Sequence, residues 1–127
     1  LLTAKLPETE RDLLDLLEPY AGEDVNGRPK ARAVLERVSS SPAMGVVSSF
    51  TFGRGYGGLR MLLAAHRIPY REISPAVWQK AMGCRTGGIK NISKRRAQEL
   101  FPMIKCTHAI SDSLLIAEFC RRLEVQA

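Results

Sequence analysis

The segment over residues 33–38, AVLERV, most constrains the fold because a single carboxylate interrupts a short apolar run. Apolar and β-branched residues at this density predict a buried strand, which we place at residues 31–38. Burying an ionised carboxylate is costly unless a cation or hydrogen-bond donors replace its water shell. We therefore expect a specific partner for Glu36. The alternative is a glutamate at the strand end that is exposed or paired with Arg37 or another base.

The length of 127 residues predicts a single domain over residues 1–127, with room for one core. No run of about 18 apolar residues is present, so a membrane span is not expected. Three cysteines without a C-x-x-C pair indicate a reducing compartment, and the cytoplasm is the expected location. The first residues show neither an initiator methionine nor a signal-peptide pattern, so we expect this sequence to be a piece of a longer chain.

The positive charge is concentrated after the first 24 residues. Residues 1–24 carry seven acids and two bases, a net charge of −5, whereas residues 25–127 carry 17 bases and six acids, a net charge of +11. A positive field of this size favours a polyanionic partner such as nucleic acid. The alternative is a basic surface that only aids solubility.

Helices and strands are expected to alternate along the chain. Hydrophobic spacing predicts helices over residues 7–20, 46–66, 75–82, 91–101 and 109–123, and strands over residues 31–38 and 68–73. Thr9 and Ser74 are the expected caps of the first and third helices. Glycines at positions 53, 55, 57 and 58 interrupt the second helix, and such a density indicates that another backbone comes close. Strands separated by helices imply a parallel sheet in an α/β fold.

Five short segments follow one another as they do in one nuclease family. They are VLERV with Glu36, residues 44–57, Ser74-Pro75 with Trp78-Gln79-Lys80, residues 90–96, and residues 112–118 (DSLLIAE). Over residues 31–122 the chain resembles the RuvC-like Holliday junction resolvases, especially their phage-type branch. The resemblance implies a ribonuclease H-like fold with parallel strands flanked by helices, and a Mg²⁺-dependent endonuclease that cuts four-way DNA junctions. It also implies a homodimer, working on branched DNA in the cytoplasm of a bacterial or phage-infected cell.

The resemblance makes Glu36 and Asp112 catalytic carboxylates and metal ligands. Phosphodiester hydrolysis needs an activated water and neutralisation of the charge that develops on the phosphate, and two hard cations about 4 Å apart supply both. Mg²⁺ prefers oxygen ligands, so paired carboxylates suit it. The alternative for Asp112 is a residue in the first turn of a helix that complements the helix dipole, worth about 0.3–1 kcal/mol.

His108 lies four residues before Asp112, one helical turn away if the helix begins early enough. The resembled family commonly has an acidic residue in this zone. His108 is therefore a candidate metal ligand and general base in its place. Imidazole is a softer ligand than Mg²⁺ prefers, which would tilt the site toward Mn²⁺. The alternative is an ordinary surface histidine.

Basic residues around the helix at 91–101 are the candidate DNA contacts. By the resemblance Lys90 approaches the scissile phosphate as a catalytic residue, where its charge would stabilise the transition state. The further candidates for backbone contacts are Lys94, Arg95, Arg96 and, more weakly, Lys80. The alternative is a solvated helix face.

Phe50 and Phe52 follow the loop after the first strand. Such side chains can enter a DNA branch point as wedges, at a cost of a few kcal/mol that is least where stacking is already broken. Core packing or a helix–helix contact within a dimer is the commoner fate of phenylalanines beside glycines. We assign this helix to a dimer interface first and to DNA second.

The sequence departs from the family before Glu36. Family members open with a strand whose aspartate bridges the metal ions, and no such segment precedes Glu36. We therefore expect the N-terminal strands of the sheet to be missing from this chain and its catalysis to be absent or impaired. The strand at 31–38 would then present an unprotected edge.

Other classes of function stay open. One is a ribonuclease H-like nuclease with a different substrate, and another is a noncatalytic nucleic-acid-binding module. A structural zinc domain would draw on Cys84, Cys106, His108 and Cys120, although their spacing matches no compact zinc pattern.

Overall fold

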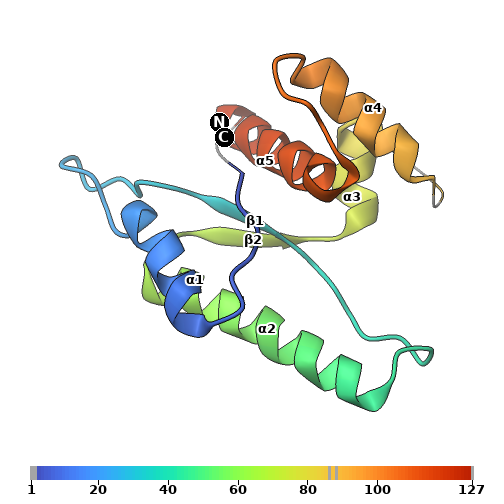
Figure 1. Ribbon diagram of the computed structural model, residues 1–127. Coiled ribbons are helices and arrows are strands. Elements are labelled where there is room, and N and C mark those ends of the chain that lie inside the picture. The colour runs from blue at the N-terminus through green and yellow to red at the C-terminus, as the bar shows by residue number, and fades with distance from the viewer. Residues whose placement is uncertain (1–2, 86, 88, 127) are drawn as a thin grey trace. The chain divides into compact units, whose positions relative to one another are not determined.

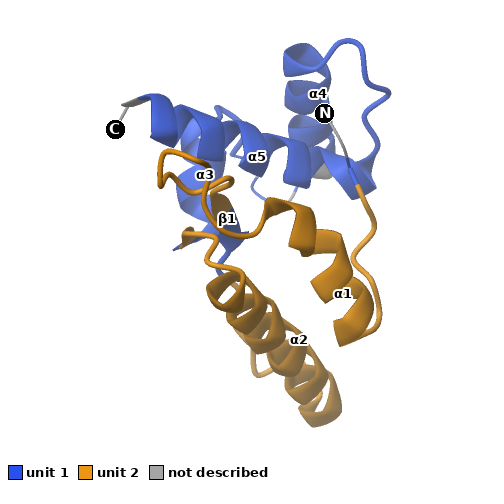
Figure 2. Cartoon of the chain, turned by 90° about the vertical axis from the view of Figure 1, so that its left-hand side faces the viewer, with its two compact units in different colours: residues 1–3, 34–37, 72–127 blue, residues 4–33, 38–71 orange. Residues whose placement is uncertain are grey.

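The computed structural model describes residues 3–85, 87 and 89–126, with the side chains of Lys90 and Gln126 left out. Helices and strands follow in the order α1, η1, β1, α2, β2, α3, α4 and α5 (Figure 1). Contacts within the chain define two compact units (Figure 2): unit 1 comprises residues 1–3, 34–37 and 72–127, and unit 2 comprises residues 4–33 and 38–71. The α/β class expected from the sequence is confirmed, and both strands contribute residues to both units.

Two parallel strands form the sheet that the described residues contain. β1 (Ala33–Glu36) pairs with β2 (Tyr70–Ile73), and Arg37 N donates to Ile73 O at 2.8 Å to extend the ladder. The parallel arrangement is therefore confirmed, and both strands are shorter than predicted. All four residues of β1 are half-buried rather than buried, because in the described part of the chain β1 has a partner strand on one side. The ribonuclease H-like assignment of this sheet stays a prediction.

Three helices build unit 1 around one hydrophobic core. α3 (Pro75–Ala81) and α4 (Lys90–Leu100) each pack against α5 (His108–Gln126). Half-buried Val34 and Ile73 cover the same core from the strands. Its buried members are Trp78, Met82, Cys84, Ala97, Cys106, Leu114, Leu115 and Phe119. Burial of each large apolar side chain contributes roughly 1.5–3 kcal/mol, so this cluster holds unit 1 together.

The end of α3 turns the chain into that core. Gly83 takes a positive φ of 68°, its N–H donates to Lys80 O at 3.2 Å, and Cys84 N donates to Gln79 O at 2.8 Å. This pair of bonds is the Schellman motif, which favours glycine because it has no Cβ. Cys84 is thereby fully buried, and burial raises the pKa of its thiol, which keeps it protonated and unreactive.

Two helices form the frame of unit 2. α1 (Glu10–Leu17) continues into a short 3₁₀ turn, η1 (Glu18–Tyr20), and packs against α2 (Val46–Ala65). The predicted cap of α1 is confirmed, because the Thr9 hydroxyl accepts a hydrogen bond from Asp12 N at 3.1 Å. The sequence therefore specifies where α1 begins through local chemistry alone.

The surface of α2 is open where the sequence predicted a close backbone. A Cβ added at the glycines at 53, 55, 57 or 58 would meet no atom within 4 Å, so that expectation is wrong for contacts within the described chain. Leu63 is the buried side chain of this helix. Its exposed large apolar side chains are Val46, Val47, Phe50, Phe52 and Met61. Within the described residues, no helix has both the length and the apolar character that a membrane crossing requires.

A second Schellman motif ends α2, with an arginine where glycine is preferred. Arg67 has φ 56° and donates from its N–H to Ala64 O at 3.1 Å, and Ile68 N donates to Leu63 O at 2.9 Å. Ile68 and Leu63 are each 5% exposed. The buried pair holds Arg67 in the left-handed conformation, which costs a residue with a Cβ about 1–2 kcal/mol.

Replacing Arg67 by glycine should raise the free energy of unfolding by about 0.5–1 kcal/mol, because the relief of strain exceeds the added flexibility of the unfolded chain. Arg67→Val should lower it by at least about 1 kcal/mol, because a β-branched residue is an outlier there. Urea denaturation measures both changes. Arg60→Gly, inside the same helix, is the control and should be destabilising by about 1 kcal/mol. A stabilising Arg67→Val would contradict the assignment.

Glu118, near the middle of α5, forms ion pairs with two arginines. Arg121 donates to both carboxylate oxygens, from Nε to Oε2 at 2.9 Å and from Nη2 to Oε1 at 2.7 Å. Arg122 Nε also donates to Oε1, at 3.1 Å. The hydrogen bonds from Arg121, and then those from Arg122, lower the pKa of Glu118 to about 2. Because the folded pKa lies below the usual value of 4.5, the contribution to stability is present above pH 4.5 and disappears as the pH falls toward 2.

Glu118→Gln should therefore lower the free energy of unfolding by about 1 kcal/mol at pH 7, a modest value because the Arg121 side chain is 63% exposed. The difference between the two proteins should shrink below pH 4.5 and vanish near pH 2. Thermal unfolding at pH 7, 4 and 2 measures it. Equal differences at all three pH values would refute the assigned cause.

Candidate functional site

Glu36 lies at the carboxyl end of β1 and is half-buried. The indole Nε1 of Trp78 donates a hydrogen bond to Glu36 Oε2 at 2.7 Å. The expectation of a specific partner is therefore confirmed, and the partner is a neutral N–H donor. Arg37, the alternative partner, is exposed, and its backbone joins the strand ladder. In open parallel sheets ligands bind outside the carboxyl ends of the strands, which is where Glu36 lies.

Asp112 lies in the second turn of α5, because that helix begins at His108. An acidic side chain stabilises the helix dipole mainly in the first turn. Asp112 lies beyond that turn, so a dipole-stabilising role does not explain it. The side chain is exposed, and its charge reaches the buried thiol of Cys84. Burial contributes most to the raised pKa of Cys84, and Asp112 adds to it. The carboxylate therefore lies near the segment that joins α3 to α4.

His108 and Asp112 share one face of α5. His108 is the first residue of the helix, and a spacing of four residues puts the two side chains one turn apart. Both are exposed. The spacing that made His108 a candidate partner of Asp112 is therefore realised, while its role as ligand or base stays a prediction.

One hydrophobic core supports both carboxylates. Glu36 is bound to Trp78, and Asp112 is followed on α5 by Leu114 and Leu115, which are buried with Trp78 in the core of unit 1. Carboxylate oxygens are the right ligand chemistry for Mg²⁺. Among the described residues, however, no group of three or more histidine, cysteine, aspartate or glutamate side chains is arranged to hold a metal ion. These residues by themselves do not fit a complete cation site.

The same finding applies to the zinc alternative, whose residues all lie in the described part of the chain. Cys84 and Cys106 are buried members of the hydrophobic core, whereas His108 is exposed at the start of α5. Buried thiols among apolar neighbours act as small hydrophobic side chains. The structure thus gives two of the three cysteines a packing role.

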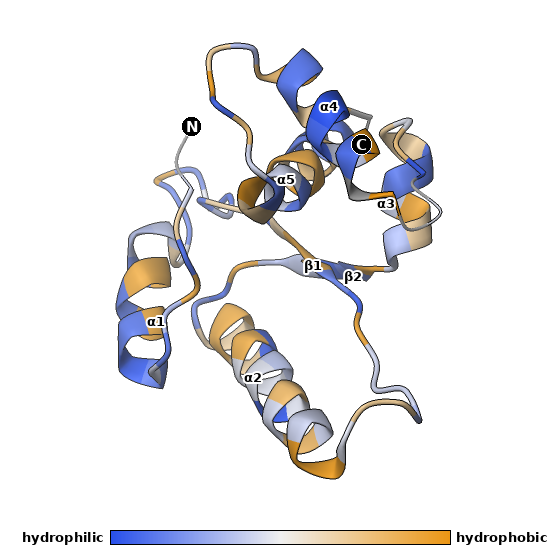
Figure 3. Cartoon of the chain, turned by 45° about the vertical axis from the view of Figure 1, so that its right-hand side comes forward, coloured by the Kyte–Doolittle hydropathy of each residue, from blue (hydrophilic) through white to orange (hydrophobic). Residues whose placement is uncertain are grey.

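Exposed bases of unit 1 lie on α3 and α4 as well as elsewhere in the unit. Lys94 and Arg95 are exposed on α4, and Lys80 is exposed near the end of α3. Figure 3 shows most of α4 in the hydrophilic colour. Unit 1 contains ten bases and six acids, a net charge of +4. Lys90 begins α4, but its side chain lies outside the described part of the structure.

Arg96 has a structural task that the sequence did not reveal. Its Nε donates to Met82 O at 2.8 Å, and its Nη1 lies 3.2 Å from Glu99 Oε2. These bonds tie α4 to the end of α3 and engage the guanidinium within unit 1. Arg96 is therefore a weaker candidate for DNA than its neighbours Lys94 and Arg95.

Phe50 and Phe52 belong to unit 2, where α2 exposes them to 69% and 45%. The guanidinium carbon of Arg54 lies 6.0 Å from the centre of the Phe50 ring, a cation–π contact. Large contiguous apolar patches often mark interaction sites, whereas singly exposed apolar side chains are ordinary. Both predicted uses, a dimer contact and a DNA wedge, remain predictions.

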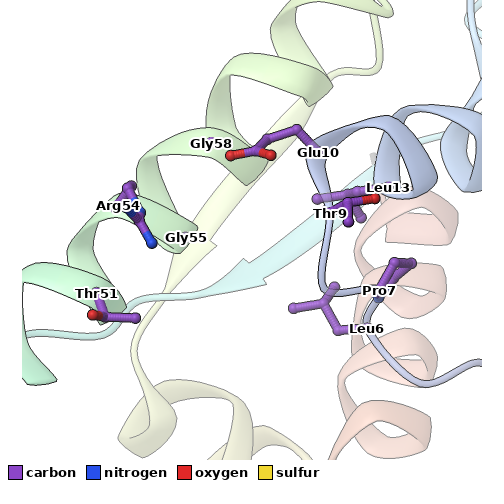
Figure 4. A pocket seen from close by; sticks show the side chains of 9 residues that line it. All are labelled: Leu6, Pro7, Thr9, Glu10, Leu13, Thr51, Arg54, Gly55 and Gly58. Atoms are coloured by element: carbon purple, nitrogen blue, oxygen red, sulfur yellow. The ribbon is translucent and has the colours of Figure 1, made fainter.

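A hollow of about 190 Å³ lies between α1 and α2 in unit 2 (Figure 4). Leu6, Pro7 and Leu13 line it from the side of α1, and Arg54 and Gly55 from α2. Its surface is mostly apolar and offers few polar groups to orient a ligand. None of the site residues predicted from the sequence lines this hollow.

Gln98 is a site-supporting residue that the sequence analysis missed. Its Nε2 donates to Phe101 O at 3.2 Å and to Ile104 O at 2.7 Å, and its Oε1 accepts from Cys106 N at 3.1 Å. One amide thus satisfies three backbone groups of the loop that leads into α5. The loop sets where α5 starts, and hence where His108 stands. A glutamine in a basic helix carries no sequence signal for this task.

Neither a protein-family model nor a curated protein sequence matches this chain. Glu36 and Asp112 stay predicted site residues: Glu36 is bonded to Trp78 of the core of unit 1, and Asp112 is exposed on α5.

Proposed function

We propose that this chain forms a nuclease domain that cuts four-way DNA junctions, as in the RuvC-like resolvases that its sequence resembles. One observation carries the proposal. Glu36 stands at the carboxyl end of a parallel strand and is held by a donor from the core of unit 1, and the same core supports α5 with Asp112. A half-buried carboxylate needs a hydrogen-bond donor in place of its lost water, and Trp78 supplies that donor.

The proposal includes Mg²⁺ as cofactor, or Mn²⁺ if His108 takes part. The oxygen chemistry of Glu36 and Asp112 supports this choice, while the described residues gather too few ligands for a complete site. A further ligand would have to join these carboxylates to hold the cation. The residues of the chain itself bind and orient the DNA.

Lys94 and Arg95 bind the phosphate backbone in this proposal. Both are exposed on a helix that carries four bases and one acid. Contacts to phosphate fix the register of DNA without reading its bases, which suits an enzyme that recognises branch shape. Each phosphate that a base neutralises releases a counterion, so binding weakens as salt rises.

A second copy of the chain is the proposed protein partner. The exposed apolar side chains of α2 support this part of the proposal, because a patch of this kind is rarely left in contact with water. A symmetric dimer would present two sites to a symmetric junction. Sedimentation of the purified protein tests it, and Phe50→Ser should then weaken association without unfolding unit 1.

Substituting Lys94 and Arg95 together by glutamine should flatten the salt dependence of junction binding. The slope of log K against log[salt] should fall by about 1.8, since each phosphate contact contributes about 0.9. Fluorescence anisotropy with a labelled four-way junction between 50 and 200 mM salt, roughly the range over which such contacts act, gives the slope. The matched control replaces Lys5 and Lys30, two exposed bases of unit 2, by glutamine. Equal slopes for all three proteins would refute the DNA surface.

Cleavage distinguishes the enzyme from a binding module. We expect Mg²⁺-dependent cutting of four-way junctions by the full-length protein, and loss of at least about 100-fold in Glu36→Gln and Asp112→Asn. Glu124→Gln, an exposed change on α5, is the control and should keep full activity. Flaps and RNA–DNA hybrids are assayed alongside. Preference for hybrids would indicate a different ribonuclease H-like nuclease, and binding without cleavage in every protein would indicate a noncatalytic module.

A further inference from the structure

Trp78 joins the hydrophobic core to the carboxylate of Glu36. Its side chain is 0% exposed, and it is the single tryptophan of the chain. The indole carries one polar atom, Nε1, and a buried N–H must find an acceptor. The acceptor is Glu36 Oε2, at a distance of 2.7 Å across 42 positions of sequence. This distance lies at the short end of the range for N–H···O hydrogen bonds.

The indole is a rigid donor because its surroundings fix it on several sides. Trp78 lies in the middle of α3, where its carbonyl accepts from Met82 N at 2.9 Å. Its ring belongs to the buried cluster that includes Leu114 and Leu115 of α5. A tryptophan has two side-chain torsions, so the packed ring has little freedom left. Glu36, by contrast, has three torsions and would otherwise sample many rotamers.

We propose that Trp78 is the positioning residue of Glu36, its N–H fixing Oε2 so that the carboxylate presents Oε1 in one orientation. Trp78 touches neither substrate nor cofactor in this role and acts through Glu36. The catalytic consequence rests on the proposed nuclease function, whereas the geometric coupling does not. Preorganisation of this kind matters because a displacement of about 1 Å at a reacting group can cost about 100-fold in rate.

Three substitutions separate the components of the coupling. Glu36→Gln keeps an oxygen acceptor and removes the charge, and Glu36→Ala removes the acceptor altogether. Trp78→Phe keeps an aromatic ring in the core and removes the donor. Because Trp78→Phe alters the core, the two Glu36 variants provide a route that does not depend on its folding. Glu72→Gln, a half-buried glutamate of β2, is the matched control.

The first measurement is the indole N–H signal in a ¹H–¹⁵N spectrum, which is unambiguous because one tryptophan is present. We expect the proton of the wild-type signal to resonate downfield and to exchange slowly with solvent. The signal should move upfield in Glu36→Gln, lose most of its exchange protection in Glu36→Ala, and stay unchanged in Glu72→Gln. An indole signal that is the same in all four proteins overturns the proposal, whatever the protein does to DNA.

The second measurement is the rate of four-way junction cleavage by the full-length protein. Trp78→Phe should lower kcat about 10-fold or more with little change in KM, and Trp78→Phe combined with Glu36→Gln should be no slower than Glu36→Gln alone. Thermal unfolding confirms that each variant is folded. Unchanged kcat in a folded Trp78→Phe overturns the positioning role. If no form cleaves DNA, the nuclease proposal fails, and the indole signal alone decides whether Trp78 holds Glu36.

Discussion

The hydrogen bond between the Trp78 indole and Glu36 connects the hydrophobic core of unit 1 to the carboxylate at the end of β1. The ring contributes apolar area to the core, and the N–H satisfies the carboxylate that β1 carries into a half-buried position. The ring can fill the core and donate to Glu36 only when α3 packs on α5, because that packing fixes the ring. Folding of unit 1 and orientation of Glu36 are therefore one event, which is how a small domain can hold a preorganised carboxylate.

The two units are stabilised in different ways. Unit 1 has a continuous cluster of buried side chains, and its connections are fastened by the Schellman motif at Gly83 and by the Gln98 amide. The buried apolar side chains described in unit 2 are Leu13, Leu63 and Ile68. Unit 2 therefore relies more on local terms such as the Thr9 cap and the helix-ending motif at Arg67. α2 also leaves several large apolar side chains exposed, among them Val46, Phe50 and Met61.

The basic residues of α4 illustrate how one sequence pattern divides between two tasks. Lys94 and Arg95 point to solvent, whereas Arg96 binds the carbonyl of Met82 and fastens α4 to α3. All three bases look alike in the sequence. Which of them faces solvent and which faces the neighbouring helix depends on the side of α4 that packs on the core, and the sequence does not show that side. The same reasoning applies to Asp112, whose place in the second turn became visible once α5 was seen to begin at His108.

The sequence by itself determined the elements: the alternation of helices and strands, the Thr9 cap, the turn at Gly83 and the position of Glu36 on a strand all follow from local preferences and periodicity. It also gave the spacing of His108 and Asp112, since helical geometry is local. Only the tertiary structure decided that Trp78 donates to Glu36, that Gln98 fastens the loop before α5, and that the glycines of α2 face open space. Those contacts join residues far apart in the chain or depend on which surface a helix buries, and no local pattern encodes either property.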